Sequence, residues 1–139
     1  MSLIKLMVVL VVMGWSASMA FAKKSIADVN IVNSISWESP LQVHCRNQHK
    51  HDALPDTTVQ YKQHVGFGFQ PNPWGTTRYT CEFKWDKYRQ EFPVWVDNFF
   101  LSFFQTRPCM HCVWTVTVNG FYREEAGKGN QQFIYYWKT

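Results

Sequence analysis

Hydrophobic and polar residues alternate along most of the chain after residue 22, and this pattern predicts β-strands. The clearest segment is 77–85, in which four large or apolar residues fall at every second position, namely Tyr79, Cys81, Phe83 and Trp85. A period of two places successive side chains on opposite faces of a sheet. We therefore expect this strand to bury one face and to expose the other.

Shorter alternating or apolar segments predict further strands, at 29–33, 41–45, 64–69, 91–96, 112–118, 121–123 and 132–137. Pro93 places the segment 91–96 at a sheet edge, because proline cannot donate a hydrogen bond within a sheet. The apolar run 98–104 fits either a buried strand or a short helix. The polar stretch 46–57 includes Pro55 and is expected to be a loop.

Two further segments predict turns. Asn119-Gly120 follows an alternating strand and is a strong hairpin signal, since a two-residue turn of this kind needs positive φ at both positions. The segment 70–75 contains two prolines, which a central strand does not tolerate. With seven to nine short strands and no convincing helix, the fold class is predicted to be an all-β, antiparallel β-sandwich.

Composition narrows the class of protein. The chain has 139 residues, of which 46% are hydrophobic and 17% aromatic, with a net charge of +4. This length suits a single domain, and the aromatic content is far too high for a disordered chain. The basic residues are scattered rather than clustered, so we expect no nucleic-acid partner.

The first 22 residues have the pattern of an export signal. Lys5 precedes an apolar run over 6–15, and Ala20-Phe21-Ala22 provides a small-x-small cleavage site. A permanent membrane anchor is disfavoured because the apolar run is short. We expect a signal peptide at 1–22 and a secreted, extracellular domain at 23–139, without membrane insertion after cleavage.

The chain contains four cysteines, Cys45, Cys81, Cys109 and Cys112. In an oxidising compartment an even number predicts two disulfides, and four cysteines allow three pairings. A zinc site is disfavoured because its ligands usually come as two close pairs. A redox-active Cys-x-x-Cys normally opens a helix, which the pattern here does not predict. We therefore expect structural disulfides, with neither a metal nor another cofactor.

These features together resemble one known family, the plant self-incompatibility proteins or S-protein homologues. The resemblance rests on the order and spacing of Val29-x-Ile31-x-Asn33, Leu41-x-Val43-His44-Cys45, Phe67-x-Phe69, Trp74-Gly75-Thr76-Thr77-x-Tyr79-x-Cys81-x-Phe83-x-Trp85, Phe92-x-Val94 and Cys109-x-x-Cys112-x-Trp114 before Asn119-Gly120. It implies a small secreted, disulfide-bonded β-sandwich without catalytic residues. The best-known members are stigma proteins that act as ligands for a pollen membrane receptor.

The resemblance also implies structural roles for shared residues, with Tyr79, Phe83, Trp85 and Trp114 facing the core. Because Cys81 and Cys112 also fall on core-facing positions of their strands, we expect disulfides that cross-link distant parts of the chain. The expected pairs are Cys45 with Cys112 and Cys81 with Cys109.

The sequence departs from the family in one segment. Members usually carry an acidic run that ends Asp-Leu-Gly shortly after the His-Cys pair, whereas this chain has His49, Lys50 and His51 before Asp52, and proline in place of the glycine. The partner preference of this chain is therefore expected to differ from that of a member with an acidic loop.

The expected function is that of a monomeric, non-enzymatic ligand for a cell-surface receptor protein, acting through loops on a rigid sandwich. The candidate loops are 46–56, 70–75 and 124–130, and the candidate contact residues are Arg46, His49, Lys50, His51, Asp52, Trp74 and Lys128.

Two alternatives belong to other classes. A secreted hydrolase of the ribonuclease type would need an acid-base pair, for example His44 or His64 with His111. A module that binds carbohydrate or a membrane surface would use exposed aromatic side chains. No hydrolase motif is present, so no catalytic residue is assigned.

Overall fold

The computed structural model describes residues 27–97 and 109–139. Within these ranges the chain forms nine strands: β1 (Ala27–Asn33), β2 (Leu41–Asn47), β3 (Asp52–Val59), β4 (His64–Phe69), β5 (Arg78–Trp85), β6 (Tyr88–Val96), β7 (His111–Val116), β8 (Phe121–Glu125) and β9 (Gln132–Tyr135). The expected signal peptide at 1–22 and the whole of the ambiguous run 98–104 lie outside the described residues.

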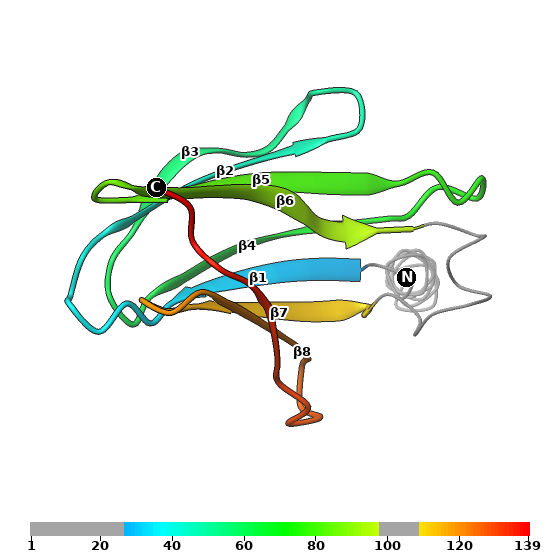
Figure 1. Ribbon diagram of the computed structural model, residues 1–139. Coiled ribbons are helices and arrows are strands. Elements are labelled where there is room, and N and C mark those ends of the chain that lie inside the picture. Colours follow the sequence, from blue (N-terminus) through cyan, green and yellow to red (C-terminus); the bar gives the residue numbers. More distant parts are fainter. Residues whose placement is uncertain (1–26, 98–108) are drawn as a thin grey trace, which may run out of the picture.

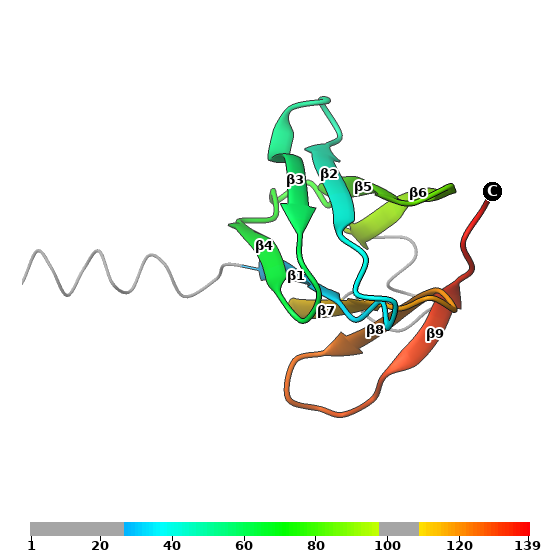
Figure 2. The same ribbon diagram turned by 90° about the vertical axis from the view of Figure 1, so that its left-hand side faces the viewer.

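The strands build two sheets that lie face to face, as Figures 1 and 2 show. The five-stranded sheet has the order β4-β1-β7-β8-β9, and the four-stranded sheet has the order β3-β2-β5-β6. The predicted all-β sandwich is therefore confirmed. One neighbouring pair departs from the antiparallel arrangement, because β1 runs parallel to β7, with Val29 beside Cys112.

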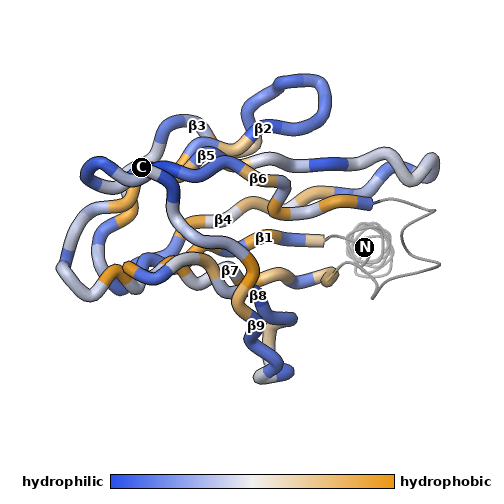
Figure 3. The backbone as a smooth tube through the Cα atoms, in the orientation of Figure 1, coloured by the Kyte–Doolittle hydropathy of each residue, from blue (hydrophilic) through white to orange (hydrophobic). Residues whose placement is uncertain are grey.

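The core lies between the sheets and follows from the alternating pattern. Figure 3 shows the hydrophobic residues concentrated along the strands and the hydrophilic residues in the protruding loops. Of the expected core residues, Phe83, Trp85 and Trp114 are buried, and Tyr79 is partly buried. The ring of Phe92 on β6 lies 4.2–5.1 Å, centroid to centroid, from its aromatic neighbours Phe83, Trp114, Phe121 and Tyr135.

The segment 46–57 is not a loop as predicted, because the end of β2 and the first six residues of β3 occupy most of it. β3 pairs antiparallel with β2, from Leu41 opposite Val59 to Arg46 opposite Asp52. Pro55 is tolerated there because β3 is an edge strand, where one row of N–H groups needs no partner in the sheet. The same rule applies to Pro93 in β6, whose predicted edge position is confirmed.

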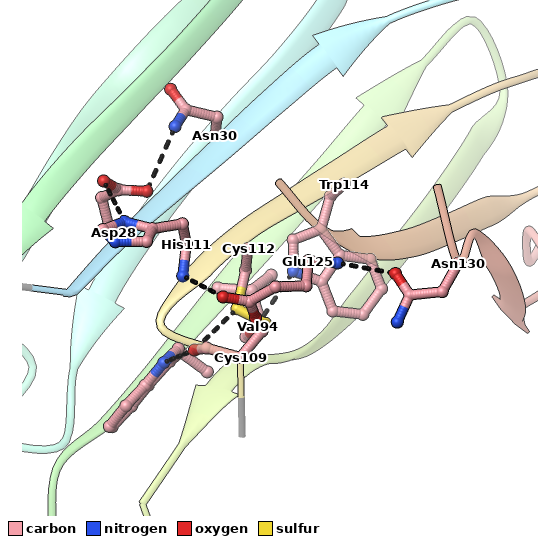
Figure 4. Close-up of a disulfide and its surroundings, with 10 residues drawn as sticks. Asp28, Asn30, Val94, Cys109, His111, Cys112, Trp114, Glu125 and Asn130 are labelled. Atoms are coloured by element: carbon pink, nitrogen blue, oxygen red, sulfur yellow. Dashed lines mark hydrogen bonds and ion pairs between the residues drawn. A yellow bond between two sulfur atoms is a disulfide. The ribbon is translucent and has the colours of Figure 1, made fainter. Parts of the chain in front are cut away.

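The four cysteines form two disulfides, as predicted, but the predicted pairing is wrong. Cys45 pairs with Cys81, and Cys109 pairs with Cys112. Cys45 and Cys81 lie opposite each other on neighbouring strands, with their Cα atoms 4.0 Å apart. Cys112 belongs to the other sheet, and its partner is three residues away along the chain (Figure 4).

The predicted hairpin between β7 and β8 is confirmed, but its predicted turn is wrong. Beyond Val116 and Phe121, the last pair of the ladder, Thr117 and Gly120 still exchange backbone hydrogen bonds, so the central residues of the turn are Val118 and Asn119 rather than Asn119 and Gly120. In this loop φ is positive at Gly120, at 147°, and not at Asn119. The Thr117 hydroxyl also accepts hydrogen bonds from the N–H groups of Asn119 and Gly120, which stabilises this shifted turn.

Candidate recognition surface

The β2–β3 hairpin carries most of the residues that we predicted from the sequence to contact a partner. Its backbone is held by Asn47, whose side-chain oxygen accepts hydrogen bonds from the N–H groups of His49 (2.9 Å) and His51 (3.0 Å). The Asn47 N–H donates to the His51 carbonyl at 2.9 Å, and Lys50 adopts a left-handed conformation with φ of 65°. The connection between the strands is therefore a tight, hydrogen-bonded tip.

An ion pair and a disulfide fix the base of the hairpin. His44 on β2 lies with Nε2 2.6 Å from Asp52 Oδ1 and Nδ1 3.6 Å from Asp56 Oδ1, so two carboxylates of β3 face one imidazole. The next residue, Cys45, ties β2 to β5 through Cys81. The hairpin thus stands on a strand that is cross-linked to the centre of its sheet.

The side chains at the tip are mostly basic. We define the hairpin tip as His49, Lys50 and His51, which are all exposed, with Arg46 partly exposed beside them. Asp52, the acidic neighbour in sequence, contacts His44 and so is directed to the base of the hairpin. The tip therefore presents the side-chain ammonium of Lys50 between two exposed imidazoles.

Trp74 belongs to the same end of the molecule as the hairpin tip. It is 79% exposed on the β4–β5 loop, where the Asn72 side-chain oxygen accepts hydrogen bonds from the Trp74 and Thr76 N–H groups, both at 3.1 Å. The Arg78 N–H, just after this loop, donates to Gln48 in the hairpin at 3.2 Å. The hairpin and the loop of Trp74 are therefore directly connected.

Lys128 is not part of that surface. It lies on the β8–β9 loop, where Gly127 and Gly129 both have positive φ. Figure 1 shows the β2–β3 hairpin protruding on one side of the sandwich and the β8–β9 loop on the other. The seven candidate contact residues therefore occupy two separate surfaces rather than one.

The histidines proposed for acid-base chemistry do not come together. His44 lies on the four-stranded sheet, and His111 on the five-stranded sheet, where its Nδ1 is 2.9 Å from Asp28 (Figure 4). His64 is paired with Val32, four residues along β1 from Asp28, which is roughly 13 Å of strand. His44 and His111 each face an aspartate instead of a second histidine.

Residues 27–97 and 109–139, which the structure describes, hold no cluster of three or more His, Cys, Asp or Glu residues that is placed to bind a metal ion. They also include no helix with the length and apolar character needed to cross a membrane. Burial raises the pKa of Tyr79 above its ordinary value, so the phenol stays neutral at physiological pH.

The sequence model of the family described as plant self-incompatibility protein S1 matches residues 28–137, which span from β1 to just past β9. The chain belongs to this family. S-protein homolog 5 of Arabidopsis thaliana is 39% identical over 69 residues, which are 50% of this chain and 52% of that protein. S-protein homolog 20 of the same plant is 28% identical over 95 residues, or 68% of this chain and 67% of that protein.

The alignments thus span about half the length of one S-protein homolog and about two thirds of the other. Within this S1-family domain, the hairpin tip coincides with the segment in which basic residues replace the expected acidic run. The sequence identified the tip residues by composition, but it did not indicate the strand that supports them. It also missed a group of exposed aromatic residues around β9, including Phe133 and Tyr136.

Proposed function

We propose that this S1-family protein is a secreted, non-enzymatic ligand that a cell-surface receptor recognises through the hairpin tip. The observation that carries the proposal is the tip itself, in which His49, Lys50 and His51 are exposed on a backbone fixed by Asn47. A rigid scaffold with an exposed, ordered tip suits recognition, because residues at such a tip can be substituted without disturbing the core.

Secretion is supported by two independent features. The first is the apolar leader at 1–22 with its small-x-small site, and the second is the pairing of all four cysteines in disulfides. Disulfides persist in oxidising compartments and are rare in the cytosol. Mass analysis of the exported protein should give a chain that begins at Lys23.

The charges of the tip give the proposal a testable pH dependence. Lowering the pH from about 7 to 5.5 adds positive charge to exposed histidines. Attachment to an anionic partner should therefore strengthen on acidification, and added salt should weaken it because exposed charges are screened. The carboxylate of Asp52 is directed to His44 and not to the tip.

A binding assay on isolated cell surfaces, at the two pH values and at two salt concentrations, tests this dependence. The mature, oxidised protein is compared with the double variant His49→Ala/His51→Ala and with His64→Ala, a control that removes an exposed histidine of β4. We expect the double variant to lose the pH dependence and the control to keep it. An unchanged pH dependence in the double variant would show that the tip is not the contact.

The same preparation tests the absence of catalysis. Incubation with RNA and with polysaccharide should give no turnover above a buffer control. Turnover that disappears in His44→Ala or His111→Ala would instead favour a hydrolase and would contradict the proposal. A pull-down of surface proteins with the oxidised chain then identifies the receptor.

A further inference from the structure

An open aromatic groove lies where the β7–β8 loop meets β8, β9 and the residues that follow β9. Its volume is about 550 Å³, and we call it the β9 groove; it is lined by Val118, Asn119, Tyr122, Phe133, Tyr136 and Trp137. This volume lies within the range of small-molecule sites, which are typically lined by aromatic residues with a few polar groups. Figure 2 shows β8 and β9 at one edge of the five-stranded sheet, away from the β2–β3 hairpin.

The aromatic rings of the groove form a connected platform. Tyr122 and Phe133 are direct partners on β8 and β9, with ring centroids 5.2 Å apart and nearly perpendicular planes. The ring of Tyr136 lies 4.6 Å from that of Phe133. Phe133 is 38% exposed and Tyr136 is 73% exposed, so part of the platform faces solvent. Exposed aromatic side chains that are gathered in one place often mark a binding site.

The platform is fixed from below. The Trp137 indole N–H donates to the Thr117 carbonyl at 2.7 Å, and its ring lies 4.5 Å from that of the buried Phe121. Gly120 leaves room for Phe133, because a Cβ atom at this position would lie 2.8 Å from Cε2 of that ring. The Trp137 ring is therefore held in place and Phe133 packs against the turn before any ligand arrives, which lowers the entropic cost of binding.

The chemistry of the lining is neutral and amphipathic. None of the six lining side chains is charged. The exposed amide of Asn119 can both donate and accept hydrogen bonds, as can the hydroxyls of Tyr122 and Tyr136. A pyranose ring has the matching properties, since its C–H groups suit the negative face of an aromatic ring and its hydroxyls both donate and accept.

We propose that the β9 groove binds a neutral glycan, with a sugar ring stacked on Tyr136 and its hydroxyls hydrogen-bonded to Asn119. The Phe133 ring is inclined at 60° to that of Tyr136, so it borders the sugar rather than stacking on it. A phosphorylated or acidic ligand fits less well, because recognition of such groups relies on Lys or Arg. A proline-rich peptide would dock through an indole N–H that donates to its carbonyls, but the Trp137 indole N–H is already bound to Thr117, so such a peptide is an outcome that the test distinguishes. A membrane surface would favour a basic rim, which the lining lacks.

The glycan site and the receptor contact are independent proposals. None of the hairpin-tip residues lines the groove, so either site can fail without affecting the other.

Titration of the mature, oxidised protein with neutral hexaoses of glucose, mannose and xylose, by calorimetry and by amide NMR, tests the glycan site. We expect saturable binding of at least one hexaose with a dissociation constant on the order of 0.1–1 mM. The amide signals that shift should include those of Asn119 and Tyr136. Tyr136→Ala should weaken binding about tenfold, because it removes an aromatic stacking surface.

Trp37→Ala is the matched control, since Trp37 is 74% exposed against 73% for Tyr136 and does not line the groove. Binding in this variant should equal that of the unmodified protein. Asn119→Ala is a second groove variant for the case that Tyr136→Ala is unstable, and the amide shifts of the unmodified protein locate the site without any variant.

Three results would overturn the proposal. The first is the absence of saturable binding by all three hexaoses. The second is binding that neither groove variant weakens, or that shifts amide signals only outside the groove. The third is preferential binding of a proline-rich peptide or of anionic lipid vesicles, titrated in parallel, with shifts in the groove.

Discussion

At the scale of single residues, alternation predicted which side chains are buried but not what the polar ones do there. Asn33 continues the alternating pattern of β1 and is fully buried. Its side-chain amide donates to the carbonyls of Ser39 and Val59, both at 2.9 Å, and its oxygen accepts from the Ile35 N–H at 3.0 Å. Asparagine is needed at this position because its side chain provides hydrogen-bond partners for two backbone carbonyls and one backbone N–H group. The alternation of apolar and polar residues cannot predict this requirement.

At Gly120, too, the sequence pattern predicted the hairpin but not the full reason for the residue. The Asn-Gly pair correctly located the hairpin, but the reason for the glycine is tertiary as well as local. Its φ of 147° favours glycine, and a Cβ atom would meet the Phe133 ring and the Tyr135 carbonyl of the neighbouring strand. That approach depends on the pairing of β8 with β9, which sequence periodicity does not contain.

We therefore predict that Gly120→Ala costs about 2–4 kcal/mol of unfolding free energy, combining backbone strain with the steric clash. Gly127→Ala is the matched control, because φ there is 81° but a Cβ atom would meet nothing within 4 Å. The control should cost only about 1–2 kcal/mol. Chemical denaturation of the two variants measures the difference, and equal losses would show that the clash is relieved without cost.

At the scale of elements, the strands were predictable where one face is buried. β5 buries Cys81, Phe83 and Trp85 at alternating positions, so its period was evident. β3 buries only Val59 among its eight residues, and an edge strand that is exposed along most of its length leaves no such period. For this reason the sequence predicts a loop where β3 supports the hairpin.

Disulfide pairing could not be predicted for a related reason. Pairing depends on which strands are neighbours, and the order β3-β2-β5-β6 is set by contacts between segments that are distant in sequence. The side chains of Cys81 and Cys112 both face the core, but this shared orientation does not tell which of the two sheets each cysteine belongs to. Both cysteines do point into the core, where each is fully buried.

The two disulfides should contribute unequally to stability. Cys45–Cys81 spans 36 residues and Cys109–Cys112 spans 3. Loop-closure entropy then gives a loss of about 4 kcal/mol for Cys45→Ala/Cys81→Ala and about 2 kcal/mol for Cys109→Ala/Cys112→Ala. Denaturation of the two double variants measures both values. A larger loss from the second pair would show that it stabilises the native state by more than chain entropy.

At the scale of the whole molecule, the sandwich depends on residues that connect its two sheets. The sequence predicted the all-β class and a range of seven to nine strands. It did not predict how one sheet packs on the other, because that packing depends on the order of the strands within each sheet. The separation of the hairpin tip from Lys128 is a consequence of that packing, whereas the β9 groove follows from the order β7-β8-β9 within one sheet.

Trp114 is the clearest connection between the sheets. It lies on β7 of the five-stranded sheet and is 1% exposed, and its indole N–H donates to the Val94 carbonyl on β6 of the four-stranded sheet at 3.1 Å. Its ring packs 4.9 Å from that of Phe92, also on β6. One side chain therefore contributes both apolar contact and a hydrogen bond across the interface of the sheets.

Trp114→Ala should destabilise the protein by about 3–5 kcal/mol, because it leaves a large cavity between the sheets and a buried carbonyl without its donor. A domain of this size is only about 5–15 kcal/mol more stable than its unfolded chain, so secretion should fall sharply. The control Trp37→Ala, at an exposed position, should stay within about 0.5 kcal/mol of the unmodified protein. Thermal denaturation and the secreted yield measure both variants. Near-normal values for Trp114→Ala would mean that the two sheets are held together without this contact, and that β7 packs against β6 in a different register.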